Sequence, residues 1–399
     1  MKRLTIGNAF EVNPRVSIKR GTDVPFITMD RLKPGHRDVT ATETRAFSSG
    51  SKFEAGDTLM ARITPCLENG KIARYLPENA AEKATGSTEF IVLRGKPGVT
   101  ITDFAYYFVT TPAIHDLSVS LMTGTSGRQR VDIGALCAAE VTIPDLGTQR
   151  SIVTILGSLD DKIAANNEVK RLTDEMIQSL WRKLINEDSS FMEFGDVVQL
   201  NPRTTARRGS RLTTIEMKNL PESGFSVDTW TVREAKGGSR YRNGDTLLAR
   251  ITPCFENGKC GYVDFLEPEE VGAGSTEFIV LRPRAGVPTA APYAIARSPE
   301  FRTFAAQTMT GTSGRQRVQP RDLETHEIAW PSEDLIADFE AKTSPLLDLA
   351  GKLRDENRNL AKTRDELLPL LMSGKITVRE AEQEASAAGA DIASEENKA

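Results

Sequence analysis

The spacing of apolar residues in the middle of the chain predicts a long amphipathic helix. Over residues 148–185 the apolar positions follow one another at steps of three and four, the spacing of one helix face. These positions are Ile152, Leu156, Leu159, Ile163, Val169, Leu172, Met176, Leu180 and Leu184. A polar residue, Asn166, stands at the seam position between Ile163 and Val169. A helix of about 37 residues is about 55 Å long, so we expect a rigid spacer or one strand of a coiled coil.

A second apolar stripe closes the chain, from about Leu335 to Met372. Its seam positions are Leu346, Leu349, Leu353, Asn357, Leu360, Leu367 and Leu371. Pro345 interrupts this stripe, so we expect either a kink or a new helix start with Ser344 as its cap. Gly374 is a plausible C-terminal stop.

The two helices can bury their stripes against each other in an antiparallel pair, which would place the globular parts at opposite ends. Asn166 and Asn357 could then fix the register, as buried polar seam residues do in coiled coils. The alternative, that each asparagine is simply exposed to solvent, stays open.

The rest of the chain repeats itself after about 188 residues. GDTLMARITPCLENGK (Gly56–Lys71) returns as GDTLLARITPCFENGK (Gly244–Lys259). STEFIVLR, MTGTSGRQRV and the earlier NPR also return, each unchanged. A period of this length indicates a duplicated domain. We therefore expect these segments: two homologous domains at 1–147 and 187–332, spacer helices at 148–186 and 333–378, and an acidic tail at 379–399.

Each globular half is expected to be a small α/β domain. FIVLR and AEVTIPD have the β-branched character of short strands. AYYFVTTPAIHDLSVSLM and APYAIARSPEFRTFAAQTM look like broken helices with a proline in the middle. The fold class is therefore α/β, with two tandem homologous domains separated and followed by long helices that pair as an antiparallel coiled coil.

Composition and charge bound the function only loosely. The chain has 399 residues, of which 39% are hydrophobic and 27% charged, as in soluble globular proteins. No apolar run approaches the ~18 residues of a membrane span, and the N-terminus lacks a signal-peptide core, so a cytoplasmic location is expected. Four cysteines without a CxxC pair, and three histidines, predict incidental thiols and no metal site.

The net charge of −4 is concentrated at the C-terminus. Residues 379–399 hold two basic and six acidic side chains, so the remaining chain is neutral overall. This alanine-rich tail is expected to be disordered or a frayed helix extension. A neutral body argues against tight stand-alone binding to DNA through charge alone.

The repeated TGTSGRQRV block is the sharpest candidate for contact with DNA. Its flexible turn could bring backbone amides to phosphate, and arginine and glutamine side chains suit phosphates and purine edges. The candidate residues are Arg128, Gln129, Arg130, Arg315, Gln316 and Arg317. Alternatively, the glycine turn and the glutamine merely orient a local helix or strand.

The ARITPC-ENGK block offers a second candidate set: Arg62, Asn69, Lys71, Arg250, Asn257 and Lys259. Its Asn-Gly pair is a hairpin turn signal and would present Lys71 and Lys259 outward, toward a DNA backbone. A purely structural turn is the alternative.

The stretches Ser17–Ser51 and Thr205–Ser239 align without gaps but share few residues, so they could hold base-reading side chains, or they could reflect loop drift after duplication.

Catalytic signals are mostly absent. Pro144-Asp145 with Asp160-Asp161-Lys162 matches a nuclease pattern in letters, but Asp160 and Lys162 fall on the predicted helix, and the second copy has Pro331-Ser332. We interpret the match as coincidence. The chain has no Walker A loop and no GxGxxG. We therefore expect no catalytic residues in this chain. An enzyme using Asp145, Asp160 and Lys162, or a protein–protein scaffold built on the helices, are the rival hypotheses.

The ordered blocks GDTL-ARITPC-ENGK, GSTEFIVLR and GTSGRQRV, each set followed by a long helix, resemble the specificity subunits of type I restriction-modification systems. The segment Ile143–Asn167 is especially similar to the family's central spacer, and the resemblance covers about Met1 to Val378. It implies two target-recognition domains that each read half of a bipartite DNA site, with two modification subunits docked on the spacer helices.

The resemblance also implies what the chain itself lacks. S-adenosylmethionine belongs to the partner adenine methyltransferase, and ATP and Mg to motor-nuclease restriction subunits, of which two can join. No cofactor is expected on this chain. Because the two halves are unusually alike, the target is expected to be a gapped, nearly inverted repeat.

Overall fold

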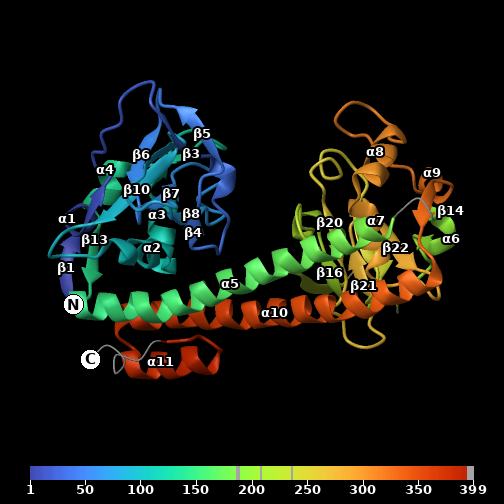
Figure 1. Ribbon diagram of the computed structural model, residues 1–399. Coiled ribbons are helices and arrows are strands. Elements are labelled where there is room, and N and C mark those ends of the chain that lie inside the picture. Colours follow the sequence, from blue (N-terminus) through green and yellow to red (C-terminus); the bar gives the residue numbers. More distant parts are fainter. Residues whose placement is uncertain (186–188, 207–208, 235–236, 393–399) are drawn as a thin grey trace. The chain divides into compact units, whose positions relative to one another are not determined.

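The computed structural model describes residues 1–185, 189–206, 209–234 and 237–392 (Figure 1). The chain divides into two compact units, which we treat separately. Unit 1 consists of Met1–Ala164 and Asn359–Ala399, and unit 2 consists of Ala165–Arg358. Both combine small sheets with helices, so the predicted mixed α/β class is confirmed. Within the described ranges, no helix is long and apolar enough to cross a membrane.

The larger sheet of unit 1 carries the first copy of the repeated sequence. Its strand order is β2–β10–β7–β8–β4. In that order the strands span Phe10–Val12, Phe90–Gly95, Thr58–Ala61, Ile72–Tyr75 and Asp38–Val39. The central strands β7 and β10 are antiparallel, with Met60 opposite Ile91. Both are buried, as expected of short continuous apolar runs. Helix α2 (Thr102–Thr110) packs on this sheet and fills the core with aromatic side chains.

A second sheet of unit 1 has the order β5–β3–β9–β6. In that order the strands span Glu43–Ala46, Asp23–Ile27, Lys83–Gly86 and Ser51–Glu54. Two further antiparallel pairs are β1–β13 (Lys2–Thr5, Glu140–Ile143) and β11–β12 (Met122–Thr123, Arg130–Val131). The short helices are α1 (Ile6–Ala9), η1 (Met29–Arg31), α3 (Pro112–Ser120) and α4 (Ile133–Ala138).

Unit 2 contains a sheet of order β15–β22–β19–β20, spanning Val198–Leu200, Phe278–Pro283, Thr246–Ala249 and Cys260–Tyr262. A second sheet has the order β17–β16–β21–β18, spanning Thr231–Glu234, Arg211–Ile215, Gly272–Gly274 and Ser239–Tyr241. The remaining elements are β14 (Ser190–Glu193), β23 (Glu327–Trp330), α6 (Phe194–Val197), η2 (Met217–Asn219), α7 (Ala291–Arg297), α8 (Pro299–Gln307) and α9 (Pro320–Glu324). Leu248 lies opposite Ile279, the register that the repeated residues Met60 and Ile91 have in unit 1.

The broken helices expected from the sequence are present in both units. Helix α2 is followed by α3, which begins at Pro112, and α7 is followed by α8, which begins at Pro299. Proline is favoured at the first helical position because its missing N–H would have no intrahelical acceptor there.

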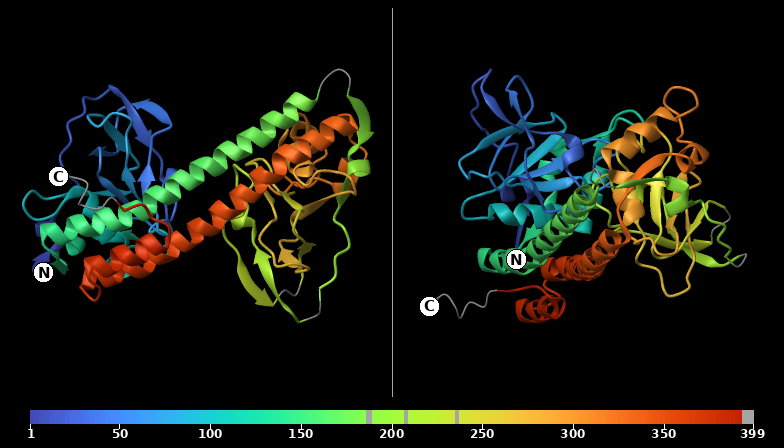
Figure 2. Two further views of the ribbon diagram at one scale, coloured as in Figure 1. Left: turned by 60° about the horizontal axis from the view of Figure 1, so that its bottom comes forward. Right: turned by 45° about the vertical axis from the view of Figure 1, so that its right-hand side comes forward.

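Two long helices complete the chain. Helix α5 spans Leu146–Leu184 and α10 spans Glu333–Ser373, and the views in Figures 1 and 2 show a stretch of each lying side by side in both units. Helix α10 continues through Pro345, so the expected restart at Ser344 is wrong. The Ser344 hydroxyl instead donates to Glu340 Oε1 at 2.9 Å, within the same helix.

The apolar stripe predicted for α5 is correct at its two ends and wrong in its middle, since Leu180 and Leu184 are half-buried against the core of unit 2. Ile152, Leu156 and Leu159 are fully buried and Ile163 is half-buried. From there the prediction drifts, because Val169, Leu172 and Met176 are 38%, 49% and 51% exposed. The buried face passes through Asn166, as predicted, and then through Lys170, Thr173, Ile177 and Trp181. The apolar pattern missed Lys170 and Thr173 because both are polar, and Lys170 reaches Asp228 at 2.6 Å.

The corresponding face of α10 also contains buried charge. Leu360, Leu367 and Leu371 are buried as predicted, Leu353 is half-buried, and Leu349 is exposed. Arg354 and Arg364, which are not among the predicted seam positions, are 2% and 8% exposed. Each forms an ion pair with an aspartate of its own unit, Asp264 and Asp160 respectively.

The two seam asparagines meet within unit 2. Asn166 is 3% exposed and donates from Nδ2 to Asn357 Oδ1 at 2.9 Å and to Glu356 Oε2 at 2.7 Å. Asn357 in turn donates to Asn167 Oδ1 at 3.0 Å. The solvent-exposed alternative is therefore wrong for Asn166.

The acidic C-terminal segment differs from the expected disorder. Residues Val378–Ala387 form helix α11, which starts with a capping box between Thr377 and Glu380. Ala381 and Ala385 are fully buried in the core of unit 1. Alanine at positions four apart gives one small apolar helix face, which a reading of net charge overlooks. Residues 393–399 of the predicted tail lie outside the described residues.

Candidate nucleic-acid interface

Three repeated blocks that are distant in the sequence meet at one place in unit 1. The Val131 N–H donates to the Arg62 carbonyl at 2.8 Å, and the Thr64 N–H donates to the Gln129 carbonyl at 3.0 Å. These bonds join the GTSGRQRV hairpin to the ARITPC turn. Arg130 then reaches Glu89 of the STEF block, with Nη2 at 2.7 Å from Oε1. The identity of these blocks between the two copies is explained by their mutual contacts.

Unit 2 builds the same arrangement from the second copy. The Val318 N–H donates to the Arg250 carbonyl at 2.8 Å, and the Thr252 N–H donates to the Gln316 carbonyl at 3.0 Å. Arg317 Nη2 lies 2.8 Å from Glu277 Oε1. The duplicated sequence therefore builds the same local geometry twice.

The tip of each hairpin is exposed. In unit 1 all residues from Thr123 to Arg128 are exposed, and in unit 2 all residues from Thr310 to Arg315. Gly124 and Gly127 have φ of 121° and 79°, and their equivalents Gly311 and Gly314 have 127° and 76°. Only glycine adopts such angles readily, so the glycines shape the tip that carries the exposed Arg128 and Arg315.

The other candidates of this block are less exposed. Gln129 and Gln316 are half-buried. Arg130 and Arg317 are held by carboxylates, and the paired arginines lower the pKa of Glu89 and of Glu277. The structure therefore separates the predicted set: Arg128 and Arg315 point outward, while Arg130 and Arg317 hold the hairpin in place.

A cleft beside the hairpin gathers further cations. In unit 1 a cleft of about 580 Å³ is lined by Arg15, Lys52, Arg62 and Thr88, among others. In unit 2 the equivalent cleft of about 380 Å³ is lined by Arg203, Arg240, Arg250 and Thr276. Arg62 and Arg250 both line these clefts, and their contact with DNA stays a prediction.

Sequence reasoning overlooked four of these cations: Arg15, Lys52, Arg203 and Arg240. The repeated NPR was the available signal. Its asparagine has positive φ, 51° at Asn13 and 46° at Asn201, and the asparagine Oδ1 accepts from the strand N–H of Val92 or Val280 at 3.0 Å. This turn places the following arginine at the cleft.

The lysines of the ENGK turn do not point outward, so that prediction is wrong. Lys71 Nζ donates to the Met29 carbonyl and Lys259 Nζ to the Met217 carbonyl, both at 3.0 Å. A half-buried ammonium group needs acceptors, and the preceding chain supplies them. Asn69 and Asn257 are exposed at the turn itself.

The variable stretches supply two strands to the second sheet of each unit, β3 and β5 in unit 1 and β16 and β17 in unit 2. Strands β5 and β17 are exposed at every position and lie at the edge of their sheets. Each carries an arginine beside a carboxylate; Arg45 Nη2 lies 2.8 Å from Glu43 Oε1 and its guanidinium lies over the Phe26 ring at 4.0 Å. An exposed strand can present alternate side chains to a groove.

The nuclease-like letters do not form a catalytic site. Asp160 is 5% exposed, accepts from the Tyr107 hydroxyl at 2.7 Å and pairs with Arg364. Asp145 caps the start of α5 by accepting from the Thr148 N–H at 3.0 Å. Across the described ranges, no three metal-binding side chains come together, and the four cysteines are free thiols.

An exposed arginine-bearing hairpin beside a cationic cleft, on a mixed α/β domain, defines a class of protein: a binding protein with surfaces suited to phosphate and base edges. Residues 6–172 match the family model described as the type I restriction modification DNA specificity domain. Through this segment the chain is similar to the type I restriction-modification specificity family.

Curated relatives agree with this assignment. The chain is 29% identical over 153 residues to the EcoAI type I restriction enzyme specificity subunit of Escherichia coli, a match covering 37% of this chain and 25% of the relative. It is 29% identical over 149 residues to the EcoEI specificity subunit, also from Escherichia coli, with the same coverage. The matched region thus spans about a quarter of the length of these relatives.

A solved structure shares the fold. The S subunit of a type I restriction-modification system from M. genitalium aligns with a TM-score of 0.52 at 13% identity, covering 93% of this chain and 96% of that chain. The similarity therefore extends, at the level of fold, across both units and the long helices.

Proposed function

We propose that this chain is the DNA sequence-specificity subunit of a type I restriction-modification complex, with one target-recognition domain in each unit. The observation that carries the proposal is the duplicated hairpin and cleft, in which Arg62–Val131 and Arg250–Val318 make the same 2.8 Å bond. Two copies of one DNA-binding surface suit a bipartite target with two related half-sites.

Two surfaces of each unit have different roles in DNA binding. The constant hairpin and cleft, with Arg128 and Arg62 in unit 1, contact the phosphate backbone and carry no sequence information. The variable stretches Ser17–Ser51 and Thr205–Ser239 read base edges, where each good contact is worth about 1–3 kcal/mol of discrimination. Different variable stretches on a constant support explain how one duplicated domain can read two half-sites.

We further propose that α5 and α10 form an antiparallel coiled coil that sets the gap between half-sites and docks two modification subunits. The hydrogen bond between Asn166 and Asn357 supports a fixed register. Two restriction subunits would join the complex for cleavage.

The chain is proposed to be non-catalytic. Asp160, the buried carboxylate of the nuclease-like letters on α5, is bonded to Arg364 and Tyr107. Methyl transfer with S-adenosylmethionine and cleavage with ATP and Mg are assigned to the partner subunits.

A domain-swap experiment tests the proposal. Replacing residues 17–51 by the sequence of residues 205–239 gives both units the same variable stretch. In a complex reconstituted with the modification subunits, the methylated sequence should become a gapped, symmetric inverted repeat of the second half-site. An unchanged target sequence would show that the variable stretches do not read DNA. The reciprocal swap, 17–51 in place of 205–239, is the matched control and should yield a repeat of the first half-site.

A further inference from the structure

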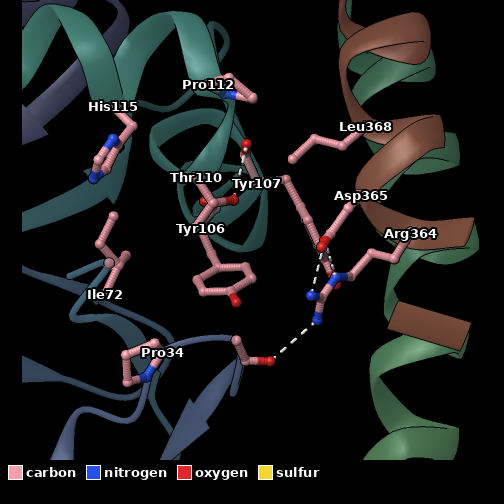
Figure 3. Close-up of a pocket in the computed structure, with 12 residues that line it drawn as sticks. Pro34, Ile72, Tyr106, Tyr107, Thr110, Pro112, His115, Arg364, Asp365 and Leu368 are labelled. Carbon is pink, nitrogen blue, oxygen red and sulfur yellow. Dashed lines mark hydrogen bonds and ion pairs between the residues drawn. The ribbon is translucent and has the colours of Figure 1, made fainter. Parts of the chain in front are cut away.

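A cavity in unit 1 lies apart from the cationic cleft. It has a volume of about 330 Å³ and opens between α2, α3 and the end of α10 (Figure 3). Its walls include the turn residues Pro34 and Gly70, the helix residues Tyr106, Thr110 and His115, and Asp365 of α10. This volume is at the lower end of the range for ligand pockets, which fits one side chain or a small ligand.

The second copy shows what can occupy this space. Pro112 and Pro299 start equivalent helices. Counting from these prolines, Thr110 corresponds to Arg297 and His115 corresponds to Arg302. Unit 2 therefore has two arginines where unit 1 has a threonine and a histidine.

In unit 2 the guanidinium of Arg297 fills the space itself. Its Nη1 donates to the Gly258 carbonyl at 2.7 Å and to the Glu222 carbonyl at 3.0 Å. Close by, the Tyr293 hydroxyl donates to Asp174 at 2.7 Å. Burial raises the pKa of the Asp174 carboxyl, and the nearby positive charge of Arg297 opposes this rise.

Unit 1 keeps the two carbonyl positions and lacks the arginine; its Gly70 carbonyl accepts from the Ile72 N–H at 2.9 Å and has a second lone pair for a ligand. Pro34 and Gly70 are the repeat equivalents of Glu222 and Gly258, and both line the cavity. The Thr110 hydroxyl is too short to cross it and instead donates to the Tyr106 carbonyl at 2.9 Å.

The side chains around the cavity add polar groups. Tyr106, the counterpart of Tyr293, points its hydroxyl into the space (Figure 3). In the part of the chain that the structure describes, this hydroxyl makes no hydrogen bond, whereas Tyr293 donates to Asp174. Asp365 supplies a carboxylate at the wall and is bonded to Arg364 Nη2 at 2.8 Å.

We propose that this cavity is a binding site for a guanidinium group, which takes the place that Arg297 fills in unit 2. The carbonyls of Pro34 and Gly70, the Tyr106 hydroxyl and the Asp365 carboxylate are its acceptors. The ligand is either an arginine side chain of a partner polypeptide or a free guanidino compound, since both present the same planar donor fork.

A second cation already at the wall does not prevent binding. Arg364 is neutralised by Asp160 and Asp365 and also donates to the Gly35 carbonyl at 3.1 Å. Unit 2 accommodates two guanidinium groups in the equivalent place: burial and the neighbouring Arg297 lower the pKa of Arg302, yet Arg302 Nη2 still donates to the Phe255 carbonyl at 2.6 Å.

Calorimetric titration of the full chain tests this site. N-acetyl-L-arginine amide should bind at one site per chain, and N-acetyl-L-citrulline amide, which has the same shape without the charge, should bind about tenfold more weakly. Thr110→Arg, which installs the arginine found in unit 2, should abolish binding. Equal binding of the arginine and citrulline probes would overturn the proposal, as would full binding by a folded Thr110→Arg variant.

A second variant keeps the test decisive if Thr110→Arg does not fold. Arg297→Thr removes the internal guanidinium from unit 2 and should raise the stoichiometry to two arginine amides per chain. A stoichiometry that stays at one in this folded variant would contradict the equivalence of the two spaces. L-arginine distinguishes the sources: affinity equal to that of the capped amide assigns a free compound, and much weaker binding assigns an arginine within a polypeptide.

Discussion

Within unit 2, Asn166 of α5 donates a hydrogen bond of 2.9 Å to the side chain of Asn357 of α10. Trp181 and Phe339 meet on the same two helices, with ring centroids 5.3 Å apart. Moving forward along α5 from Asn166 to Trp181 thus means moving backward along α10, from Asn357 to Phe339. The helices therefore run in opposite directions in this unit, with the two asparagine side chains bonded across the pair.

Removing one member of the asparagine pair should destabilise unit 2. Asn166→Leu removes the donor that bonds Asn357 Oδ1, and leaving an acceptor unpaired inside the protein costs about 1–3 kcal/mol. The double variant Asn166→Leu/Asn357→Leu should recover part of this loss in denaturant unfolding. Leu172→Ala, at a position 49% exposed, is the control and should change the unfolding free energy by less than about 0.5 kcal/mol. If Leu172→Ala lowers the unfolding free energy more than Asn166→Leu does, then Leu172 lies on the buried face of α5, as the apolar pattern predicted.

Breaking the buried ion pair of unit 1 should have a larger effect. Arg364→Met leaves Asp160 in a site where its side chain is 3% exposed, and removing one partner of a buried pair costs about 3–5 kcal/mol. Equilibrium unfolding by urea measures this loss. Asp160→Leu combined with Arg364→Met removes both charges and should be the more stable of the two variants.

The pH dependence of the Arg364→Met variant follows from Asp160. Burial raises the pKa of this carboxyl above its ordinary value of 3.8, and Arg364 opposes the rise. A folded carboxyl with a raised pKa holds its proton more readily than the unfolded chain does, so stability falls as pH rises through the interval above 3.8. Without Arg364 the pKa of the folded Asp160 carboxyl rises further, so the pH interval over which stability falls becomes wider. The stability difference between wild type and Arg364→Met should therefore grow from pH 4 to pH 7, and a constant difference would mean that Asp160 is not the group responsible.

Substitutions of the hairpin arginines should have two different kinds of effect. Arg128→Ala and Arg315→Ala remove exposed charges, so the thermal unfolding temperature should stay the same. In the assembled complex the slope of log affinity against log salt should fall by about one for each phosphate that the variant no longer neutralises.

Arg130→Ala is the structural counterpart. It leaves Glu89 without the bidentate partner that lowers its pKa, so the hairpin should loosen and the unfolding temperature should drop. A salt slope unchanged by both Arg128→Ala and Arg315→Ala would remove the hairpin from the interface.

Changing the length of the helices should change the gap in the target. Inserting seven residues into both α5 and α10 at the asparagine seam adds two turns, about 10 Å, which corresponds to about three base pairs of DNA. Methylation by the reconstituted complex should move to a target with a longer gap and the same half-sites. An insertion in α5 alone breaks the register and should reduce assembly. An unchanged gap in the double insertion would argue against a spacer role.

Sequence patterns predicted the parts that depend on local chemistry. The repeated blocks, the long helices and the proline-broken helices all follow from periodicity and from the fixed geometry of proline and glycine. The buried face in the middle of α5 followed only in part, because Lys170 and Thr173 lie on it and the partner of Lys170, Asp228, comes from a distant segment. Polar residues become compatible with burial only through tertiary contacts, which periodicity does not show.

The candidate site was predictable in composition but not in geometry. Arg128 and Arg130 are two residues apart and look alike in sequence, yet one is exposed and the other is held by Glu89, 41 residues away. Lys71 looked exposed beside an Asn-Gly turn, and its acceptor is the carbonyl of Met29, 42 residues away. These roles are decided by long-range partners, which a single sequence does not identify.

The most direct test of the specificity role is single-molecule methylation mapping of the source genome with and without this gene. The account predicts that one gapped motif, with two related half-sites in nearly inverted orientation, loses adenine methylation when the gene is removed and regains it on complementation. Complementation by a variant carrying Arg128→Ala and Arg315→Ala should restore the same motif at reduced occupancy. A methylome that is unchanged by deletion, in a strain where the neighbouring methyltransferase is expressed and active, would contradict the account.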